Sequence, residues 1–506
     1  MDSFALTIVN GEKSTVIGCR TGESILSAMQ RAGFAGIHAP CGGQGRCGQC
    51  TVLLSGREVL ACRTFPEEDC TVCVPVERGE VVVSSGAADI QPCGSGLGLA
   101  VDIGTTTVAA YLYDLKSGKY LGSEGESSAQ RPYGADVISR ITCCGRPGGL
   151  DGLAFSVRNQ LGEMAKRLCT AAGRSVSEIE RISAAGNTVM EHIFEGLSPV
   201  GIGSAPFEPI SRFGYEVPAS GLIDGIGKDA GVYLCPALAG YVGGDITAGL
   251  LSSGACRSKE LCLFIDIGTN GEMALGDEHG FVTCAAAAGP AFEGAEIDCG
   301  MPAADGAVNR VGIDGGKITV SVIGETEAAG VCGSGLIDAA AVLLQCGALL
   351  PSGRLLPPDE APERVRDRLR RDENGRVRFY LAENVYVSDA DVRKLQLAKA
   401  AIRAGVETLL AKRGVAVSEV GALYLAGGFG AYLDMRSACR LGMLPTELLG
   451  RTRVCGNTSG LGAVMALSQQ GRADMEAFAA KCSYLEMSTS PEFGEKFMEY
   501  MFFGDE

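Results

Sequence analysis

Apolar and polar positions in the first 80 residues alternate with the short period of strands, and one helical pattern interrupts them. Turn residues such as glycine, serine and asparagine separate the apolar runs, which is typical of a small sheet. The predicted strands cover residues 6–9, 14–17, 51–54, 58–61 and 70–75, with a helix opening at residues 24–29 and a hairpin turn at residues 55–57.

Farther along the chain, an apolar strand followed by a glycine-containing turn and a second strand occurs twice. The first strand of each copy ends at an aspartate, Asp102 in one and Asp266 in the other, within the sequence Asp-Ile-Gly-Thr. A third apolar strand, over residues 422–426, leads through a Gly-Gly turn into a helix. The turn residues are Gly104, Thr105 and Thr106, then Gly268, Thr269 and Asn270, and last Gly427, Gly428 and Phe429.

These turns have the composition of a nucleotide site. An aspartate at a strand end can hold Mg²⁺ through its waters, while threonine hydroxyls and turn amides face phosphate oxygens. Asp-x-Gly-Thr alone is also ordinary hairpin-turn composition, but two copies favour the nucleotide interpretation. An adenosine can lie against the bare backbone of the Gly-Gly turn. The turns are neither a Rossmann fingerprint nor a P-loop, because both of those motifs are absent.

Length, composition and charge limit the possible functions. A chain of 506 residues has material for about three domains. Its 72 glycines are about twice the usual share, which indicates many tight turns. The net charge of -16 argues against nucleic acid and anionic membranes as partners. The start lacks a basic segment and polar residues interrupt the long apolar stretches, so we expect a soluble, cytoplasmic protein.

Four of the 21 cysteines stand in a spacing that suits an iron–sulfur cluster. Cys41, Cys47, Cys50 and Cys62 form C-x5-C-x2-C-x11-C, with three of them on one glycine-rich loop. A 2Fe-2S cluster needs four thiolates, and glycines let backbone amides approach its sulfides. Zinc sites typically pair two C-x2-4-C knuckles, of which this segment has one. We interpret Cys70 and Cys73, and most other cysteines, as structural.

The N-terminal order of elements resembles the β-grasp ferredoxins, and the later turns resemble the phosphate-1, phosphate-2 and adenosine motifs of the ASKHA superfamily of kinases and actin. Over nearly its whole length the chain is similar to reductive activators of corrinoid enzymes, which use ATP to restore cobalt(I). In place of an expected Asn-x-Gln stands Ser128-Ala129-Gln130, and the linker is short for this family. The segments that carry the resemblance are residues 133–140, 185–190, 243–248, 288–294, 332–335 and 396–401.

The resemblance implies an α/β multidomain chain, with a β-grasp 2Fe-2S ferredoxin followed by RNase-H-like, ASKHA actin-like ATPase domains. We expect a ferredoxin domain at 1–79, a linker at 80–96, a middle RNase-H-like domain at 97–256 and a C-terminal ASKHA-type domain at 257–506. The implied cofactors are a 2Fe-2S cluster, ATP and Mg²⁺. The implied partner is the corrinoid protein of a methyltransferase system, while the electron donor and a homodimeric state stay open.

Several residues keep two interpretations. Asp266 is the favoured nucleotide residue, which leaves Asp102 in a related but vacant fold, and the reverse assignment is open. Asp245 is either a cation or phosphate-water ligand or a helix N-cap. Glu272 either orients a hydrolytic water or lies on a solvated strand face. The amides of Gly333 and Ser334 can cradle a phosphate, whereas the Cys332 thiol is interpreted as packing.

Two other functions compete with corrinoid activation. An ASKHA fold with a regulatory cluster suits a small-molecule kinase, because fold alone does not fix function. A redox-sensing module with a structural nucleotide is the non-enzymatic alternative. The three histidines are scattered along the chain, which excludes a histidine-based metal site.

Overall fold

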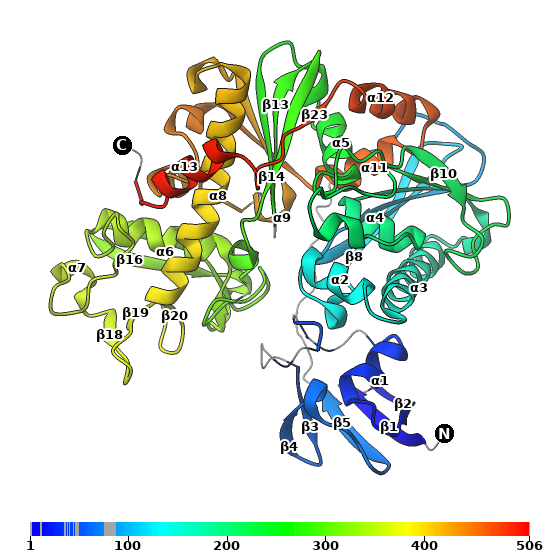
Figure 1. Cartoon of the computed structure of the whole chain (residues 1–506), viewed down its shortest axis with the longest axis horizontal. Coiled ribbons are helices and arrows are strands. Elements are labelled where there is room, and N and C mark those ends of the chain that lie inside the picture. The colour runs from blue at the N-terminus through cyan, green and yellow to red at the C-terminus, as the bar shows by residue number, and fades with distance from the viewer. Residues whose placement is uncertain are drawn as a thin grey trace. The chain divides into compact units, whose positions relative to one another are not determined.

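We analysed a computed structural model of the chain, which forms two compact units (Figure 1). One unit comprises Met1–Ala248 with Ser459–Glu476, and the other comprises Gly249–Thr458 with Ala477–Glu506. The structure describes residues 3–10, 13–34, 37, 39, 41–43, 45, 50–74, 88–268, 270–294, 296–430 and 432–504. Among these residues, every helix is too short or too polar to span a bilayer.

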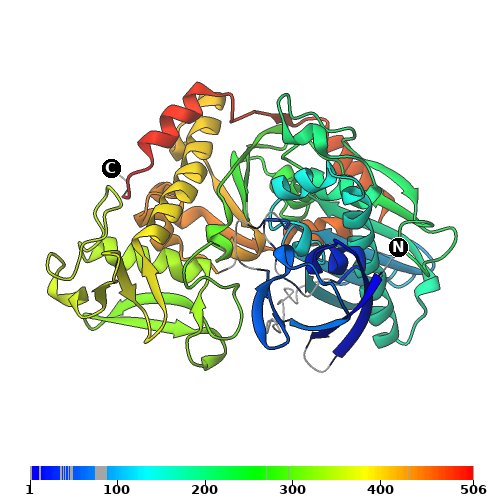
Figure 2. The same ribbon diagram turned by 60° about the horizontal axis from the view of Figure 1, so that its bottom comes forward.

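The chain begins with a five-stranded sheet in the order β2-β1-β5-β3-β4, drawn in blue in Figures 1 and 2. Strand β1 runs parallel to β5 and antiparallel to β2. Helix α1 buries Ile25, Leu26, Ala28 and Met29 in the same core as the sheet residue Leu6. The elements are β1 (Ser3–Asn10), β2 (Lys13–Arg20), α1 (Ile25–Arg31), β3 (Thr51–Leu54), β4 (Arg57–Leu60), η1 (Ala61–Arg63) and β5 (Cys70–Val74).

The predicted strands and helix of this domain are confirmed, with one difference in the hairpin. The turn between β3 and β4 contains only Ser55 and Gly56, because both have positive φ, 50° and 79°. Such a two-residue turn matches the twist of the paired strands. Strand β4 therefore begins at Arg57, and Ala61 starts a 3-10 turn instead of ending the strand.

The next segment forms a six-stranded sheet in the order β10-β11-β9-β6-β7-β8. Helix α3 packs apolar residues such as Val157 and Leu161 into the core that contains Leu99 and Val101. The elements are β6 (Leu97–Ile103), β7 (Thr107–Asp114), β8 (Lys119–Ser127), η2 (Arg131–Tyr133), α2 (Val137–Cys144), α3 (Gly149–Ala171), η3 (Val176–Glu178), β9 (Ile179–Gly186), α4 (Thr188–Glu195), η4 (Val200–Gly203), β10 (Tyr215–Pro218), β11 (Gly231–Leu234) and α5 (Gly244–Ser252).

The second unit contains another six-stranded sheet, in the order β22-β21-β12-β13-β14-β23, and two small sheets of three strands each. The long helix α8 contributes Leu395, Ile402 and Leu409 to the core of this unit. Its strands and longer helices are β12 (Cys262–Ile267), β13 (Gly271–Asp277), β14 (Gly280–Ala286), β15 (Ala307–Asp314), β16 (Lys317–Val322), β17 (Gly330–Val331), α6 (Gly333–Gln345), β18 (Leu369–Arg371), β19 (Val377–Tyr380), β20 (Tyr386–Ser388), α8 (Asp389–Arg413), β21 (Ala422–Ala426), β22 (Thr452–Gly456), β23 (Ser483–Tyr484) and α13 (Pro491–Glu499).

The remaining helices and 3-10 turns connect these strands and helices. They are η5 (Ala255–Arg257), η6 (Pro290–Glu293), η7 (Ile323–Glu325), α7 (Glu363–Arg366), η8 (Val417–Glu419), α9 (Gly427–Gly430), α10 (Met435–Arg440), η9 (Thr446–Arg451), α11 (Thr458–Met465) and α12 (Gln469–Ala479). Most of α11 and α12 belongs to the N-terminal unit, although both helices come late in the sequence. The sequence analysis did not predict that this late segment joins the first unit.

The two six-stranded sheets share one arrangement around their central strand. Strand β6 pairs antiparallel with β7 and parallel with β9, and β12 pairs in the same way with β13 and β21. In each sheet the predicted aspartate is the last residue but one of the central strand. The structure thus confirms the predicted α/β fold, a ferredoxin-like sheet followed by two related RNase-H-like sheets.

Candidate cluster loop and nucleotide site

Three of the four predicted cluster cysteines lie close together in the N-terminal sheet domain. The thiols of Cys50 and Cys62 interact directly, and both residues are buried. Burial, then the Cys50 thiol and Cys41, raises the pKa of Cys62 to about 11. Cys47 lies outside the described residues. Cys41 and Cys50 lie in the connection between α1 and β3, whereas Cys62 comes from η1.

The backbone of the loop at Gly43 lies beside Leu26 and Cys62. Gly43 has a φ of 81°, and a Cβ atom there would lie 3.2 Å from Leu26 and 3.9 Å from the Cβ of Cys62. Within the described part of the chain, no three Cys, His, Asp or Glu side chains could hold one metal ion. Paired thiols beside close backbone suit a cluster in which four cysteines are divided between two irons. The described residues therefore fit a 2Fe-2S cluster.

The first Asp-Gly-Thr turn is held by two polar side chains from distant segments. Ser459 Oγ, at the start of α11, donates a hydrogen bond to Asp102 Oδ1 over 2.8 Å. Asn187 Nδ2 donates to Thr105 Oγ1 over 2.9 Å, while its Oδ1 caps α4. Sequence reasoning missed both roles, although Asn187 lies in a segment that carried the family resemblance. The turn is therefore fixed before any ligand binds.

A buried arginine also holds the Asp102 turn, through a hydrogen bond to its backbone. Arg140, in α2, is fully buried, and its Nη2 donates to the Thr105 carbonyl over 2.5 Å. Its Nε donates to the Gly134 carbonyl over 3.1 Å, and its Nη1 donates to Gln130 Oε1 over 3.0 Å. Ser128 N donates to the Thr106 carbonyl over 2.8 Å. Arg140 thus ties the Asp102 turn to the segment that precedes α2.

Gly104 leaves room for this tight turn, because a Cβ atom there would collide with the Thr107 carbonyl. Asp245 is the second residue of α5, and its Oδ1 accepts from the Ile246 amide over 2.8 Å. The N-cap interpretation of Asp245 is therefore wrong, because the helix already begins at Gly244. The binding interpretation of Asp245 stays a prediction.

Near Asp245 lies a carboxyl group that the sequence analysis did not identify. Glu191, in α4, is fully buried, and among the described residues neither oxygen has a hydrogen-bond partner of normal geometry. Burial, and secondarily the charge of Asp245, raises the pKa of Glu191 well above its usual range. Burial and the neighbouring Asp245 thus both favour the neutral form of the Glu191 carboxyl group.

The second Asp-Gly-Thr turn brings Asp266 and Glu272 to opposite positions of the β12–β13 pair. Glu272 is only 8% exposed, so the interpretation that it lies on a solvated strand face is wrong. Both faces of β13 are covered, as the unbroken burial of its first six residues indicates. The Gly268 amide donates to the Asn270 carbonyl over 2.9 Å and closes the turn, while Thr269 lies outside the described residues.

The Gly-Gly turn after β21 lies directly against Asp266. Gly427 has a φ of 84°, and a Cβ atom there would come well within 3.0 Å of the Asp266 carboxylate. Gly428 is exposed with open space around it, and the Phe429 ring stacks on Phe292 at 5.2 Å and 23°. The predicted adenosine turn and the second aspartate are thus at one place in the second unit.

The N-terminus of α6 lies beside the same phenylalanines. A Cβ atom on Gly333 would collide with the Phe292 carbonyl and lie 2.8 Å from Phe429. Ser334 is buried, and its hydroxyl donates to the Asn309 carbonyl over 3.0 Å. The Cys332 thiol donates to the Val308 carbonyl over 3.4 Å, as packing predicts. Asp266, Gly427, Phe429 and Gly333 therefore form one continuous candidate site.

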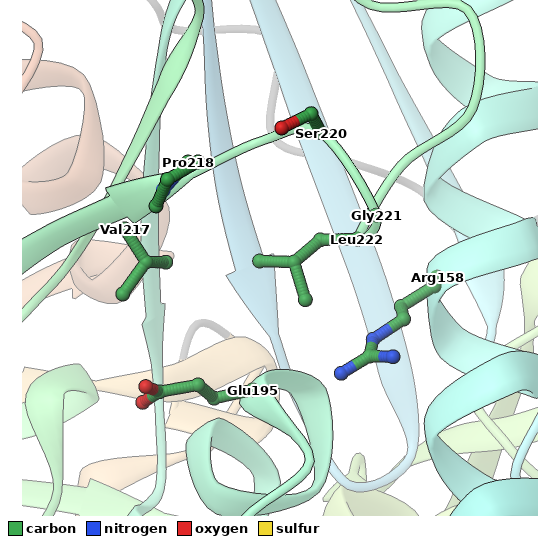
Figure 3. Close-up of a pocket in the computed structure, with 7 residues that line it drawn as sticks. All are labelled: Arg158, Glu195, Val217, Pro218, Ser220, Gly221 and Leu222. Carbon is green, nitrogen blue, oxygen red and sulfur yellow. The ribbon is translucent and has the colours of Figure 1, made fainter.

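A pocket of about 410 Å³ in the N-terminal unit involves none of the predicted site residues (Figure 3). Arg158 lies at one side of it and donates from Nε to the Phe194 carbonyl over 2.8 Å. A second pocket, of about 310 Å³, shares Arg158. The lining residues of the first are Arg158, Glu195, Val217, Pro218, Ser220, Gly221 and Leu222.

Three family models match consecutive parts of the chain. Residues 8–69 match the 2Fe-2S iron-sulfur cluster binding domain. Residues 97–258 match the RACo middle region, and residues 260–506 match the C-terminal domain of RACo, the ASKHA domain. The chain therefore carries a 2Fe-2S ferredoxin-type domain and an ASKHA domain, a fold that binds nucleotides.

Named relatives agree with these matches. The corrinoid activation enzyme RamQ of Eubacterium limosum is 36% identical over 424 residues, which cover 81% of this chain and 70% of that protein. The Co(II) methylated amine-specific corrinoid protein reductase of Methanosarcina barkeri is 26% identical over 440 residues, covering 79% and 76%. The solved structure of a reductive activator for corrinoid, iron-sulfur protein matches 98% of both chains, with a TM-score of 0.72 and 30% identity. The chain therefore belongs to the family of reductive activators of corrinoid proteins.

Proposed function

We propose that this protein uses ATP to reduce the cobalt(II) form of a corrinoid protein to cobalt(I), with an electron that leaves its ferredoxin domain. The observation that carries the proposal is the presence of a cysteine-rich cluster loop and an ASKHA-type site on one chain that matches a reductive activator over 98% of its length. The acceptor is a corrinoid protein of a methyltransferase system, and the donor is an external reductant. The proposal includes a ferredoxin domain at 1–79, a linker at 80–96, a middle domain at 97–256 and a C-terminal domain at 257–506.

In the ferredoxin domain, Cys41, Cys47, Cys50 and Cys62 would hold the cluster. When bound, a 2Fe-2S cluster supplies a carrier for one electron. The nearby loop glycines allow amide hydrogen bonds to the cluster sulfides, which help to set its potential. The buried positions of Cys50 and Cys62 keep water away from that side of the loop.

At the nucleotide site, Asp266 would hold Mg²⁺ through water, and Glu272 would orient the attacking water. The two residues are directly paired across β12 and β13, so their side chains lie on the same face of the sheet. Gly268, Thr269 and Asn270 would face the phosphates, and Gly333 and Ser334 would offer backbone amides. The Gly427 to Phe429 turn would take the adenosine. In the middle domain, Asp102, Gly104, Thr105, Thr106 and Asp245 form a related turn whose nucleotide role we rank second.

Energy from ATP is needed if the reduction potential of the cobalt is lower than the reduction potential of the cluster. For one electron, each 59 mV uphill costs about tenfold, so a gap of roughly 120 mV leaves about one acceptor in a hundred reduced. ATP can shift this equilibrium only through different affinities for the partner before and after reduction. We therefore expect the cobalt(II) partner to stimulate hydrolysis and the cobalt(I) partner to dissociate more readily.

An anaerobic assay tests the function. It follows cobalt(I) absorbance and phosphate release together, with chemically reduced protein and a cobalt(II) corrinoid protein. We expect slow basal hydrolysis that rises when the partner is added. Phosphorylation of a small molecule while the corrinoid stays cobalt(II) would contradict the proposal and favour the kinase alternative.

A further inference from the structure

Within the N-terminal unit, the ferredoxin domain contacts the middle domain through a reciprocal pair of hydrogen bonds. Tyr133 Oη, in η2, donates to the Gln30 carbonyl in α1 over 2.6 Å. Gln30 Nε2 in turn donates to the Pro132 carbonyl over 2.6 Å. Two short bonds that join the same two segments in opposite directions fix their register as well as their distance.

A second contact lies on the cluster loop itself. Arg146 Nη1, just after α2, donates to the Gly42 carbonyl over 3.2 Å. Gly42 follows the cluster cysteine Cys41, and a Cβ atom on Gly42 would lie 2.5 Å from the Tyr133 carbonyl. Only glycine permits the loop to come this close to η2. The backbone of the loop at Gly42, next to Cys41, therefore lies against the middle domain.

A third contact is apolar. Phe155, on α3, is 56% exposed. Its ring would lie 3.0 Å from a Cβ atom at Gly33, which follows α1 and has a φ of 71°. The ring thus reaches the ferredoxin domain while much of it stays open to solvent. Such a partly covered ring suits a contact that opens and closes.

The middle-domain side of the contact is held independently of the ferredoxin domain. The Tyr133 ring packs in a core with Val137, Ile141 and Leu153. The following Gly134 carbonyl is bonded by buried Arg140, which also holds Thr105 in the Asp102 turn. The residues 133–140 that carried the family resemblance thus have a structural role that corrinoid reduction does not explain.

We propose that η2, Arg146 and Phe155 form a docking surface for the chain's own ferredoxin domain, from which this domain detaches reversibly to exchange electrons. Among the described residues, the hydrogen bonds that join the two domains come from the side chains of Tyr133, Gln30 and Arg146. Polar interfaces of this kind between domains of one chain allow relative motion. The covalent link keeps the local concentration of the ferredoxin domain high, so a small interface suffices for docking. The inference depends on the ferredoxin domain and not on the identity of the acceptor.

Pulsed EPR on the full chain tests this proposal. The reduced cluster provides one spin, and a nitroxide on a keto amino acid at position 210 of the middle domain provides the other without cysteine chemistry. Ile210 is 66% exposed, so labelling there leaves the core intact. We expect one narrow distance distribution in the unmodified chain, and a broad one in the double variant Tyr133→Phe/Arg146→Ala.

The matched control is Tyr215→Phe/Arg167→Ala. It removes the same side-chain groups from middle-domain positions whose partners are Glu195, Ser211, Glu124 and Glu126. Each lost bond should raise the detached population roughly fivefold. Gln30→Ala removes one bond from the ferredoxin side, that of Gln30 Nε2 to the Pro132 carbonyl, and leaves the Gln30 carbonyl that accepts from Tyr133. It should therefore broaden the distribution in the same direction but less than the double variant, which guards against a folding defect of the middle domain. A broad distribution in the unmodified chain, or a narrow one in all contact variants, would overturn the proposal.

Discussion

Replacing Gly427 by alanine tests the candidate nucleotide site through one added methyl group. The new Cβ atom would lie well within 3.0 Å of the Asp266 carboxylate, so the carboxylate must shift by a distance on the order of 1 Å. The positive φ of 84° costs alanine a further 1–2 kcal/mol or so in backbone strain. We expect the shift of Asp266 to weaken binding of Mg²⁺ and an ATP analogue at least tenfold, which corresponds to about 1.4 kcal/mol.

The matched control for this change is Gly414→Ala. Gly414 ends α8 with a φ of 66°, and a Cβ atom there would meet nothing within 4 Å. Both variants therefore place alanine at a positive φ, and only Gly427→Ala disturbs Asp266. Isothermal titration should show unchanged affinity in the control. Equal affinity in both variants, or equal loss in both, would refute the assignment of the Asp266 and Gly427 contact to the nucleotide site.

The remaining predictions concern the cluster and a buried carboxyl group. Cys62→Ser should abolish the EPR signal of the reduced cluster, whereas Cys73→Ser should leave it unchanged, and iron analysis checks both. The stability that neutral Glu191 contributes is fully present below the ordinary pKa of a carboxyl group and is lost as the pH rises through the raised pKa of the folded protein. Glu191→Gln should therefore raise the melting temperature in alkaline buffer and remove a slope of up to about 1.4 kcal/mol per pH unit, while Glu163→Gln should not.

Local features of the fold could be predicted because they depend on neighbouring residues. The cysteine spacing, the two Asp-Gly-Thr turns and the Gly-Gly turn each lie within a short segment. The three turns each follow a strand as predicted, while the cluster set with Cys47 stays a prediction. The width of the hairpin turn at Ser55 was overestimated, since a β-turn needs only two residues when both adopt positive φ.

Features that depend on distant segments could not be predicted. The period of two along a strand separates its faces but does not say whether both are covered, so the burial of Glu272 escaped prediction. The hydrogen bond from Ser459 to Asp102 joins residues 357 positions apart, and no local sequence pattern predicts it. Arg140 lies within a recognised motif, yet only the fold shows that its guanidinium holds the Thr105 carbonyl.

The most direct test of the central claim compares cobalt(I) formation by the unmodified chain and by Asp266→Ala, each with the cluster reduced beforehand. We predict that the unmodified chain produces cobalt(I) with ATP and little without it. Asp266→Ala should keep the EPR signal of the cluster but lose the effect of ATP, and Asp102→Ala should lose less. Equal accumulation of cobalt(I) with and without ATP in the unmodified chain would contradict the claim that nucleotide energy drives this electron transfer.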